Sequence, residues 1–337
     1  MKNTSPEVDA TMTIEARRVL VSGGAGFIGS HIVDGLLKNG HQPFVVDNLS
    51  TGSRRNLPAN VPMFEVDICD GPRLAAVFDE VRPDWVCHQA AQMSVSRSMR
   101  EPVFDAQVNV IGLLQVLDNA TRCGVQRVVF ASSGGVLYGD VSTPAVEQTP
   151  ACPISPYGIA KWVGEQYLQF FAREHGLHAV ALRYANVYGP RQNPHGEAGV
   201  VAIFSQHLLA GNSATINGDG KYIRDYVYVT DVARANILAL ESELAPRFVP
   251  LNIGTGQGTD VNELAALVGK QVQAIWDSAG SKTPIPTIRH GEPRIGDLRS
   301  NLVCADEARR VLGWTPEVEL VDGLRQTVAW FDLKRSE

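Results

Sequence analysis

The segment from Val19 to Ser30, which reads VLVSGGAGFIGS, constrains the fold more than any other part of this 337-residue chain. A short run of β-branched residues leads into glycines at positions 23, 26 and 29, and an apolar stretch from His31 to Leu37 follows. This pattern predicts a buried strand, a tight turn and the start of a helix. The glycines permit the turn, a close approach of the backbone to a pyrophosphate and tight packing of helix on strand.

An acidic residue ends the next expected strand, which covers Gln42 to Val46. Asp47 follows that strand, eighteen residues after Gly29. A carboxylate at this place accepts hydrogen bonds from the ribose hydroxyls of an adenosine and repels a 2′-phosphate. No arginine follows directly. The strand, the glycines, the helix and the acid together predict a site for NAD rather than NADP.

Strand and helix patterns alternate through the first half of the chain. Further strands are expected at 62–66, 84–89 and 127–131, and helices at 74–81 and 103–123. Such alternation predicts an α/β fold with a doubly wound parallel sheet, whose ligand lies outside the carboxyl ends of the strands. Asn109 interrupts the apolar face of the second helix, which predicts a buried amide bonded to a neighbouring loop.

Length predicts about two domains. We expect a flexible tail over residues 1–16, a Rossmann NAD-binding domain over 17–182 with returning segments near 226–256, and a mainly substrate-binding domain over 183–337. Beyond Arg183 the pattern loosens, and the stretch from Gln192 to Gly199 is typical of a lid or specificity loop.

The bulk composition excludes several classes of partner. A net charge of −6 gives no electrostatic reason to expect nucleic acid or an anionic membrane, and no apolar run reaches the length of a membrane span. The five cysteines show neither close pairing nor the spacing of metal ligands. The first sixteen residues lack the apolar core of a signal peptide. We therefore expect a cytoplasmic protein with reduced thiols and no metal.

The catalytic chemistry is expected after the fifth strand. That strand runs into Ser132 and Ser133, and the later segment SPYGIAK contains Tyr157 and Lys161. The two residues are four apart after a proline typical of a helix start, so they share one helix face. A neighbouring ammonium favours the phenolate and is expected to lower the pKa of Tyr157, which suits a general base. The Ser133 hydroxyl is placed to share the proton path.

Ten motifs carry a family resemblance from Val19 to about Trp330. They are GGAGFIGSH, VVDNLSTG, HQAAQMSVSRS, FASSGGVLYG, SPYGIAK, LRYANVYGPRQ, GEAGVVAIF, GDGKYIRDYVYVTDV, LNIGTG and RIGD. The chain resembles the extended short-chain dehydrogenase/reductase family, and within it the NAD-dependent nucleotide-sugar 4-epimerases of the UDP-glucose and UDP-GlcNAc type. The resemblance implies that Tyr157 is the base, Lys161 its partner and a nearby hydroxyl the third member. The commonest family position for that hydroxyl, four residues before Tyr138, is Gly134 here, so Ser133 is assigned and Ser132 stays open.

The same resemblance and the motif positions imply the ligand-binding residues. The expected cofactor residues are Gly23, Gly26, Phe27, Ile28, Gly29, Asp47, Asn48, Thr51, Gly52, Asp67, Ile68, Gln89, Ala90, Ala91, Gln92, Asn109, Tyr157, Lys161 and Tyr184. The expected substrate residues are Ser133, Tyr157, Asn186, Gly199, Val200, Thr215, Ile216, Asn217, Arg224, Arg294 and Asp297. Guanidinium groups such as those of Arg224 and Arg294 bind a diphosphate bidentately.

The resemblance implies an isomerase, whose reaction is inversion at C4 of a UDP-sugar through a transient 4-keto intermediate. Gly134 and Gly135 stand where 4,6-dehydratases carry an Asp-Glu pair, which disfavours dehydration. Asn301 stands where hexose-only relatives carry a tyrosine, so an N-acetylated sugar is admitted as well. The alternatives are a UDP-uronic acid or another NDP-sugar as substrate, another NDP-sugar dehydratase or reductase, and a non-catalytic NAD sensor. Relatives usually form homodimers through the helices that begin near Val103 and Tyr157.

Overall fold

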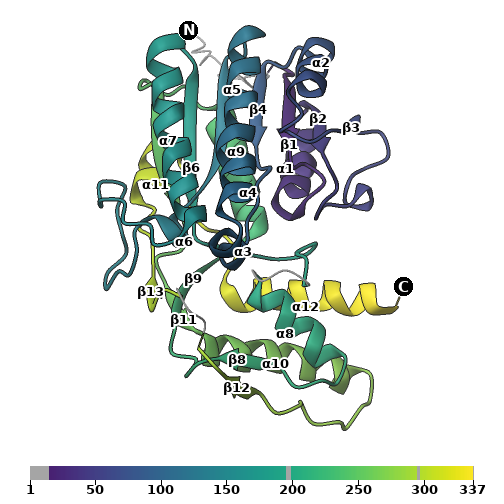
Figure 1. Cartoon of the computed structure of the whole chain (residues 1–337). Helices are drawn as coiled ribbons and strands as arrows, with labels where there is room; N and C mark the ends of the chain where they lie inside the picture. Colours follow the sequence, from purple (N-terminus) through teal and green to yellow (C-terminus); the bar gives the residue numbers. More distant parts are fainter. Residues whose placement is uncertain (1–14, 195–198, 294–296, 337) are drawn as a thin grey trace, which may run out of the picture.

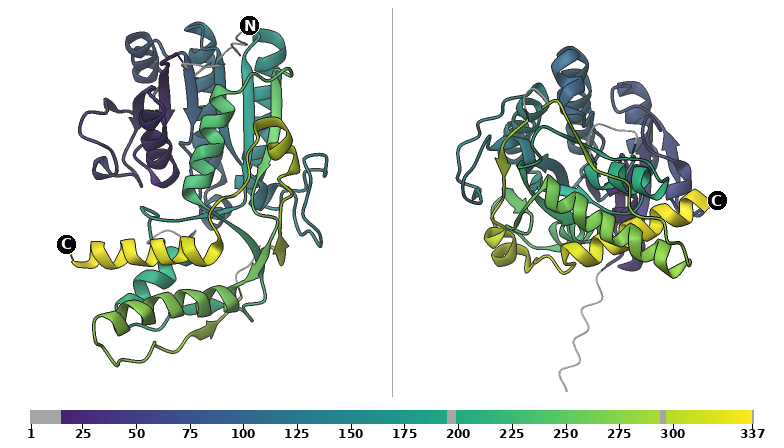
Figure 2. Two further views of the ribbon diagram at one scale, coloured as in Figure 1. Left: turned by 180° about the vertical axis from the view of Figure 1, so that it is seen from behind. Right: turned by 90° about the horizontal axis from the view of Figure 1, so that it is seen from below.

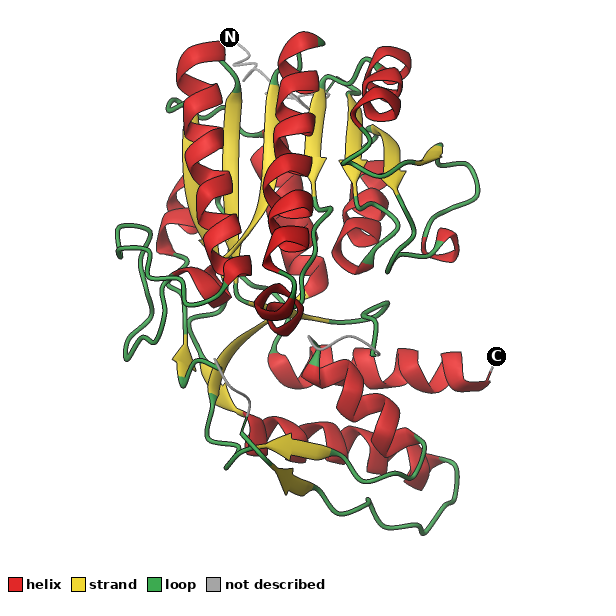
Figure 3. Cartoon of the chain, viewed as in Figure 1, coloured by secondary structure: helices red, strands yellow, loops and turns green. Residues whose placement is uncertain are grey.

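The computed structural model describes residues 15–194, 199–293 and 297–336. Residues 1–14, which make up most of the expected tail, and Arg294 lie outside these ranges. A large α/β part and a smaller part face each other (Figures 1 and 3). The long helices of the large part run beside the strands of its sheet on both faces, and the smaller part is built mainly from helices α8, α10 and α12.

The large part is built on a sheet of seven parallel strands, as the sequence predicted. The strand order is β10-β6-β5-β4-β1-β2-β3. The strands are β1 (Arg18–Ser22), β2 (Gln42–Asp47), β3 (Met63–Glu65), β4 (Trp85–His88), β5 (Arg127–Ser133), β6 (His178–Tyr184) and β10 (Phe248–Ile253). In the central strand β1, Val19, Leu20 and Val21 are almost completely buried because helices cover both faces. The predicted doubly wound α/β fold is confirmed.

Two layers of helices bury the sheet. One layer contains α1 (Phe27–Lys38), α9 (Val229–Glu241) and α11 (Asp306–Leu312), and the other contains α2 (Gly71–Val81), α5 (Gly112–Arg122) and α7 (Pro156–His175). Figure 2 shows α1 and α9 side by side on the rear face. Helix α9 and strand β10 come from the later half of the chain, so residues far apart in sequence build this part together.

The helix expected over 103–123 contains a wider turn. It consists of α4 (Pro102–Ala106), the π-helical turn η2 (Gln107–Ile111) and α5. The buried Asn109 lies in this turn, accepts from the Gln92 backbone N–H at 3.0 Å and donates to the Gln92 carbonyl at 2.9 Å. The prediction of a buried amide bonded to a neighbouring loop is confirmed, and the wider turn accompanies that inward-facing side chain.

The smaller part has its own core and short strands. Helices α8 (Val200–Leu209), α10 (Val261–Ser278) and α12 (Leu320–Ser336) pack around Phe204, Leu264 and Leu324. Four strands form one sheet, namely β7 (Asn186–Tyr188), β9 (Ile223–Tyr228), β11 (Gly258–Asp260) and β13 (Ser300–Asn301), while β8 (Thr215–Asn217) pairs with β12 (Arg289–Gly291). Short helical segments complete the chain as η1 (Arg54–Asn56), α3 (Val95–Arg100) and α6 (Gly134–Leu137). Within the described ranges, no helix combines the length and apolar character needed to cross a membrane.

Candidate active site

A cleft of about 490 Å³ lies at the carboxyl ends of the parallel strands and is lined by both parts of the molecule. It brings together every described residue that the sequence predicts for the substrate, and most of those predicted for the cofactor. Three predicted cofactor residues, Gly52, Gln92 and Asn109, do not line it. Gly52 packs its backbone against Ala25, and Gln92 and Asn109 bond to each other in the adjoining wall.

The glycine turn between β1 and α1 forms one end of the cleft. Gly23 has φ +69°, and a Cβ there would lie 2.6 Å from the Ala90 nitrogen. Gly26 precedes α1 and offers no side chain to cap its first N–H groups. Free N–H groups at a helix start and a backbone without side chains make a cradle for a pyrophosphate. The residues present therefore fit a dinucleotide.

Gly29→Ala tests this cradle. A Cβ at Gly29 would lie 2.2 Å from the Gly23 carbonyl oxygen, so the turn must open. Overpacking of this kind costs about 1–3 kcal/mol, and we expect NAD affinity to fall by about fivefold to 150-fold in a calorimetric titration. Gly269→Ala is the matched control. Gly269 lies in helix α10 of the smaller part, and a Cβ there makes only an ordinary 3.6 Å contact with Ile285. Equal NAD affinity in both variants would contradict the assignment.

The acid at the end of β2 is held in place by backbone donors. Asp47 accepts from the Ala25 N–H at 3.0 Å and from the Leu49 N–H at 2.8 Å. Burial raises its pKa, and these two hydrogen bonds oppose the rise. Beside it, Asn48 donates to Asp67 at 2.8 Å, and both residues line the cleft. This is the end at which an adenosine is expected.

Tyr157 and Lys161 enter the cleft from the first turns of α7. Ser155 caps this helix by accepting from the Gly158 N–H at 3.1 Å, and Pro156 occupies its first position. The Lys161 ammonium donates to the Ala131 carbonyl at 2.8 Å and lies 5.6 Å from the centre of the Tyr157 ring. The serine cap and the proline at the helix start thus place both groups beside the end of β5.

Of the two serines that the sequence left open as the third catalytic residue, Ser133 is the better placed. Its side chain lies close enough to Tyr157 to lower the pKa of the phenol, whereas the Ser132 hydroxyl donates to Glu165 at 2.5 Å. Gly134, the commonest family position for the hydroxyl, has no room for a side chain, since a Cβ would lie 2.7 Å from a Val303 methyl. The geometry therefore supports Ser133 over Ser132.

The expectation that Lys161 lowers the pKa of Tyr157 is wrong for the protein without a bound cofactor. Burial raises the pKa of Tyr157 far above its usual value, the charge of Asp105 raises it further, and the Ser133 hydrogen bond lowers it only in part. Burial also lowers the pKa of Lys161 to about 8, although Asp105 opposes this change. The reason is that Tyr157 is desolvated, while the ammonium bonds a backbone carbonyl instead of the phenol.

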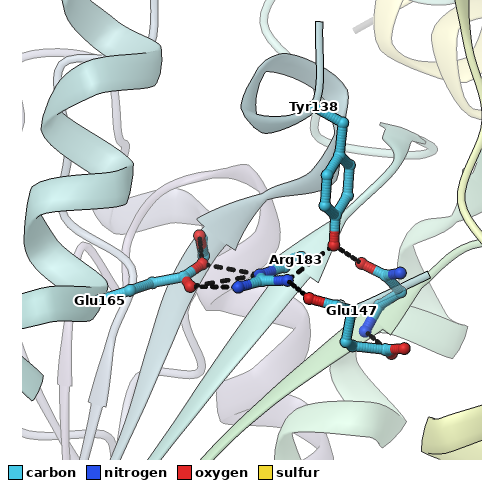
Figure 4. Close-up of polar contacts among 6 residues, drawn as sticks. Tyr138, Glu147, Glu165 and Arg183 are labelled. Atoms are coloured by element: carbon cyan, nitrogen blue, oxygen red, sulfur yellow. Dashed lines mark hydrogen bonds and ion pairs between the residues drawn. The ribbon is translucent and has the colours of Figure 1, made fainter. Parts of the chain in front are cut away.

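A buried polar network supports the catalytic loop from behind (Figure 4). Glu165 on α7 accepts from the Arg183 guanidinium on β6, with contacts of 2.6 to 3.2 Å, and from Ser132. Arg183 also donates to the Tyr138 hydroxyl at 2.7 Å and to the Glu147 carbonyl at 3.0 Å. The network joins α7 and β6 to the loop before α7. It also holds Ser132, the residue next to Ser133, in place through Glu165.

The strands of the smaller part bring donors for an anionic substrate into the cleft. Arg224 on β9 donates to Asp297 at 3.3 Å, and both line the cleft. The Nδ2 of Asn186 is buried without a hydrogen-bond partner among the described residues. Asn301 does not line the cleft; its buried amide donates to the Gly134 carbonyl at 3.1 Å.

Sequence reasoning missed several lining residues. Gln192 is buried with its Oε1 unpartnered within the described chain, and the ring of Tyr222 lies near the guanidinium groups of both Arg224 and Arg299. Val46 and Val66 each precede a predicted aspartate by one residue, so strand position was an available signal for them. Gln192 and Tyr222 lie in loops; Gln192 begins the stretch expected as a lid or specificity loop, but neither residue was assigned to the site individually.

The comparisons with known proteins agree with this geometry. The profile described as "NAD dependent epimerase/dehydratase family" matches residues 19–254, more than half of the chain. The chain therefore belongs to this NAD-dependent family, and the resemblance stated from its motifs is confirmed.

Three solved structures are similar over nearly the whole chain. UDP-glucose 4-epimerase of Thermotoga maritima, solved with UDP-glucose, is 47% identical with a TM-score of 0.88, covering 95% of this chain and 100% of that one. The UDP-glucose 4-epimerase of Thermus thermophilus in complex with NAD is 43% identical with a TM-score of 0.86, covering 93% and 98%. UDP-N-acetylglucosamine 4-epimerase of Methanobrevibacter ruminantium, in complex with UDP-N-acetylmuramic acid, is 33% identical with a TM-score of 0.84, covering 95% and 100%.

Proposed function

We propose that this enzyme inverts C4 of a UDP-sugar, interconverting UDP-glucose and UDP-galactose. The observation that carries the proposal is a single cleft lined by Tyr157 and Ser133, by the glycine turn of a dinucleotide cradle, and by Arg224 and Asn186 from the sheet of the smaller part. Similarity to UDP-glucose 4-epimerases at up to 47% identity supports it.

The residues of the glycine turn, Asp47 and Asp67 would hold the cofactor. When bound, NAD supplies the acceptor of the C4 hydride and afterwards its donor. Tyr157 takes the proton of the sugar 4-hydroxyl as the 4-keto sugar forms, and returns it after the sugar has turned to present its other face. Ser133 holds the hydroxyl hydrogen in line, and Lys161 supplies positive charge near the phenolate while its ammonium is protonated. Because burial alone disfavours the phenolate, this charge and that of the nicotinamide oppose the effect of burial.

Rotation of the sugar requires an anchor elsewhere on the substrate. Arg224 on β9 and the unpartnered amide of Asn186 on β7 supply donors for the diphosphate from strands other than the helix that carries Tyr157. Arg294, the other expected clamp, lies outside the described residues. An anchor on the diphosphate leaves the hexose free to turn.

Arg224→Ala is expected to raise the KM for UDP-galactose about tenfold to a hundredfold with a smaller change in kcat. The reason is that a hydrogen bond to a charged group contributes about 1.5–3 kcal/mol to binding. Steady-state kinetics measure both constants. Arg325→Ala removes an exposed arginine that pairs with Asp322 on α12, and it is expected to leave both constants unchanged. A KM unaltered in Arg224→Ala would argue against the clamp.

A panel of nucleotide sugars tests the reaction itself. The protein is incubated with NAD and UDP-glucose, UDP-galactose, UDP-GlcNAc or UDP-glucuronic acid, and the C4 epimers are separated by chromatography. We expect the first pair to react, and UDP-GlcNAc is the second candidate because position 301 is not a tyrosine and a UDP-N-acetylglucosamine 4-epimerase is similar. If only UDP-glucuronic acid gave an epimer, the substrate would be a UDP-uronic acid instead of UDP-glucose. If no sugar gave an epimer, a non-catalytic NAD sensor would be favoured.

We further propose a homodimer built on α4, η2 and α7. These elements expose apolar side chains in number, among them Val103 at 82%, Phe104 at 40%, Trp162 at 41% and Phe170 at 43%. Exposed apolar surface of this extent is typical of an interface. A cytoplasmic location stays a prediction, supported by five cysteines that form no disulfide.

Trp162→Asp is expected to convert the dimer to a monomer, because a charge placed in an apolar interface is desolvated without a partner. Light scattering after gel filtration measures the mass. Leu333→Asp is the control, since Leu333 is 68% exposed on the distant helix α12. A monomeric mass for the wild-type protein would contradict the proposed homodimer.

A further inference from the structure

An aromatic ring stands beside the proposed diphosphate clamp and has no role in the reaction described above. Tyr222, in the loop between β8 and β9, is partly buried and lines the cleft. The guanidinium carbon of Arg224 lies 5.9 Å from the centre of its ring, and that of Arg299 lies 4.8 Å from the same centre. Both are distances of a cation–π contact. Tyr222 therefore touches the arginine that we assign to the substrate.

The ring of Tyr222 is held by neighbours that are themselves fixed. Gly218, whose φ is +70°, leaves room for the ring, since a Cβ there would lie 3.1 Å from a ring carbon. Arg299 donates to both carboxylate oxygens of Asp219, at 2.9 and 2.8 Å. The Ile223 N–H donates to the Arg299 carbonyl at 2.9 Å, where β9 pairs with β13 (Figure 1). Arg299 is thus tied through its backbone and its side chain, and it supports the ring from a fixed position.

The two guanidinium groups beside the ring differ in how their charges are compensated. The hydrogen bonds from Arg299 hold the pKa of Asp219 well below its usual range, so these two residues form an ion pair at neutral pH. Arg224 donates to Asp297 at 3.3 Å and to the carbonyl of its neighbour Ile223 at 2.9 Å. These contacts leave N–H groups of Arg224 available for an incoming anion. Its orientation therefore depends on a single long contact to a carboxylate, on its own strand and on the ring.

We propose that Tyr222 is a positioning residue, whose ring holds the Arg224 guanidinium in the orientation that binds the diphosphate of the substrate. A guanidinium that is already in place loses less freedom when a ligand binds, so the ring raises affinity without touching the reacting atoms. The inference rests on the proposed role of Arg224 as the clamp. It also requires more than that role, because the contribution of the ring must vanish when Arg224 is removed.

The test is a double-mutant cycle on the NAD-bound protein, with UDP as the titrated ligand and calorimetry as the measurement. Tyr222→Leu keeps apolar bulk over Gly218 and removes the aromatic face. It is expected to weaken UDP binding by about threefold to thirtyfold, the range of cation–π contacts from exposed to desolvated sites. In a protein that already carries Arg224→Ala, the same substitution is expected to change UDP affinity by less than about twofold.

Kinetics and a conservative variant separate this role from a purely structural one. Tyr222→Leu is expected to raise the KM for UDP-galactose by the same factor and to leave kcat within about twofold of the wild-type value. Tyr222→Phe keeps the ring and is expected to restore wild-type affinity. Tyr167→Leu is the matched control, because Tyr167 is exposed on α7 and is not among the residues that line the cleft. It is expected to change neither constant.

Unchanged UDP affinity in Tyr222→Leu would overturn the proposal. An equal loss with and without Arg224 would also overturn it, since the tyrosine would then act through a contact of its own, and so would a phenylalanine variant as weak as the leucine one. Tyr222→Ala is a second variant, and failure of both truncations to fold would assign the ring to the structure of the loop instead.

The same measurements distinguish this inference from the proposed reaction. If Arg224→Ala alone leaves UDP binding unchanged, the clamp fails and the role of Tyr222 fails with it. If the cycle shows the expected coupling but no UDP-sugar is epimerised, the proposed reaction fails while the role of Tyr222 stands.

Discussion

Tyr157→Phe is expected to lower kcat for epimerisation by about 10²- to 10⁴-fold, the usual contribution of a general base. The substitution removes the oxygen that Ser133 contacts and leaves the ring packed beside Lys161. Affinities for NAD and for the UDP-sugar are expected to change by less than about threefold, since neither the glycine turn nor Arg224 is touched. Turnover is measured by chromatography of the epimers, and the affinities by calorimetry.

Tyr167→Phe is the matched control for that experiment. Tyr167 lies on the same helix but is 36% exposed and away from the cleft, so kcat is expected to stay at the wild-type value. Turnover of Tyr157→Phe at a wild-type rate would show that another group takes the proton. Loss of NAD binding in the variant would instead show that the hydroxyl supports the cofactor site.

Glu165→Gln is expected to destabilise the protein by about 3–5 kcal/mol, because it leaves the buried Arg183 guanidinium without its counter-charge. The side chains of Glu165 and Arg183 are 1% and 10% exposed, and several hydrogen bonds join them. The shift of the urea midpoint at an unchanged slope measures the loss. Activity is expected to fall as well, since the carboxylate holds Ser132, the neighbour of the proposed third catalytic residue Ser133.

An exposed ion pair supplies the comparison. Glu101→Gln removes the partner of Arg97 on the surface, where both side chains are more than two-fifths exposed, and is expected to cost less than about 1 kcal/mol. Combining Glu165→Met with Arg183→Met removes both buried charges, and this double variant is expected to be more stable than Glu165→Gln alone. A loss below about 1 kcal/mol in Glu165→Gln would mean that the pair is not needed for folding.

The features that could be predicted from sequence are those encoded by neighbouring residues. The glycine turn, Asp47 at a strand end and the four-residue spacing of Tyr157 and Lys161 depend on a few positions each, and the structure places all of them in one cleft. The parallel sheet followed from the alternation of strand and helix patterns, because parallel strands need helical crossovers.

The features that could not be predicted depend on distant parts of the chain. The pKa of Tyr157 was misjudged because burial and Asp105 act on it from elements that the motif does not contain. The π-helical turn Gln107–Ile111 was not predicted, because a single wider turn inside an otherwise regular helix has no sequence signal of its own; Asn109 predicted only a buried amide. The cleft-facing loop around Gln192 and the network of Arg183 with Tyr138 join segments that no local spacing relates.

The edge strand β10 and the covering helix α9 follow β9 in the chain, yet they complete the first sheet. The polypeptide therefore crosses between the two parts more than once, and the cofactor half is interleaved with the substrate half. A gene fragment that ends near residue 182 would encode a large part without strand β10 and without the covering helix α9. Exchange of the substrate-binding part for that of another protein therefore requires several junctions in the coding sequence, because no single linker separates the two parts.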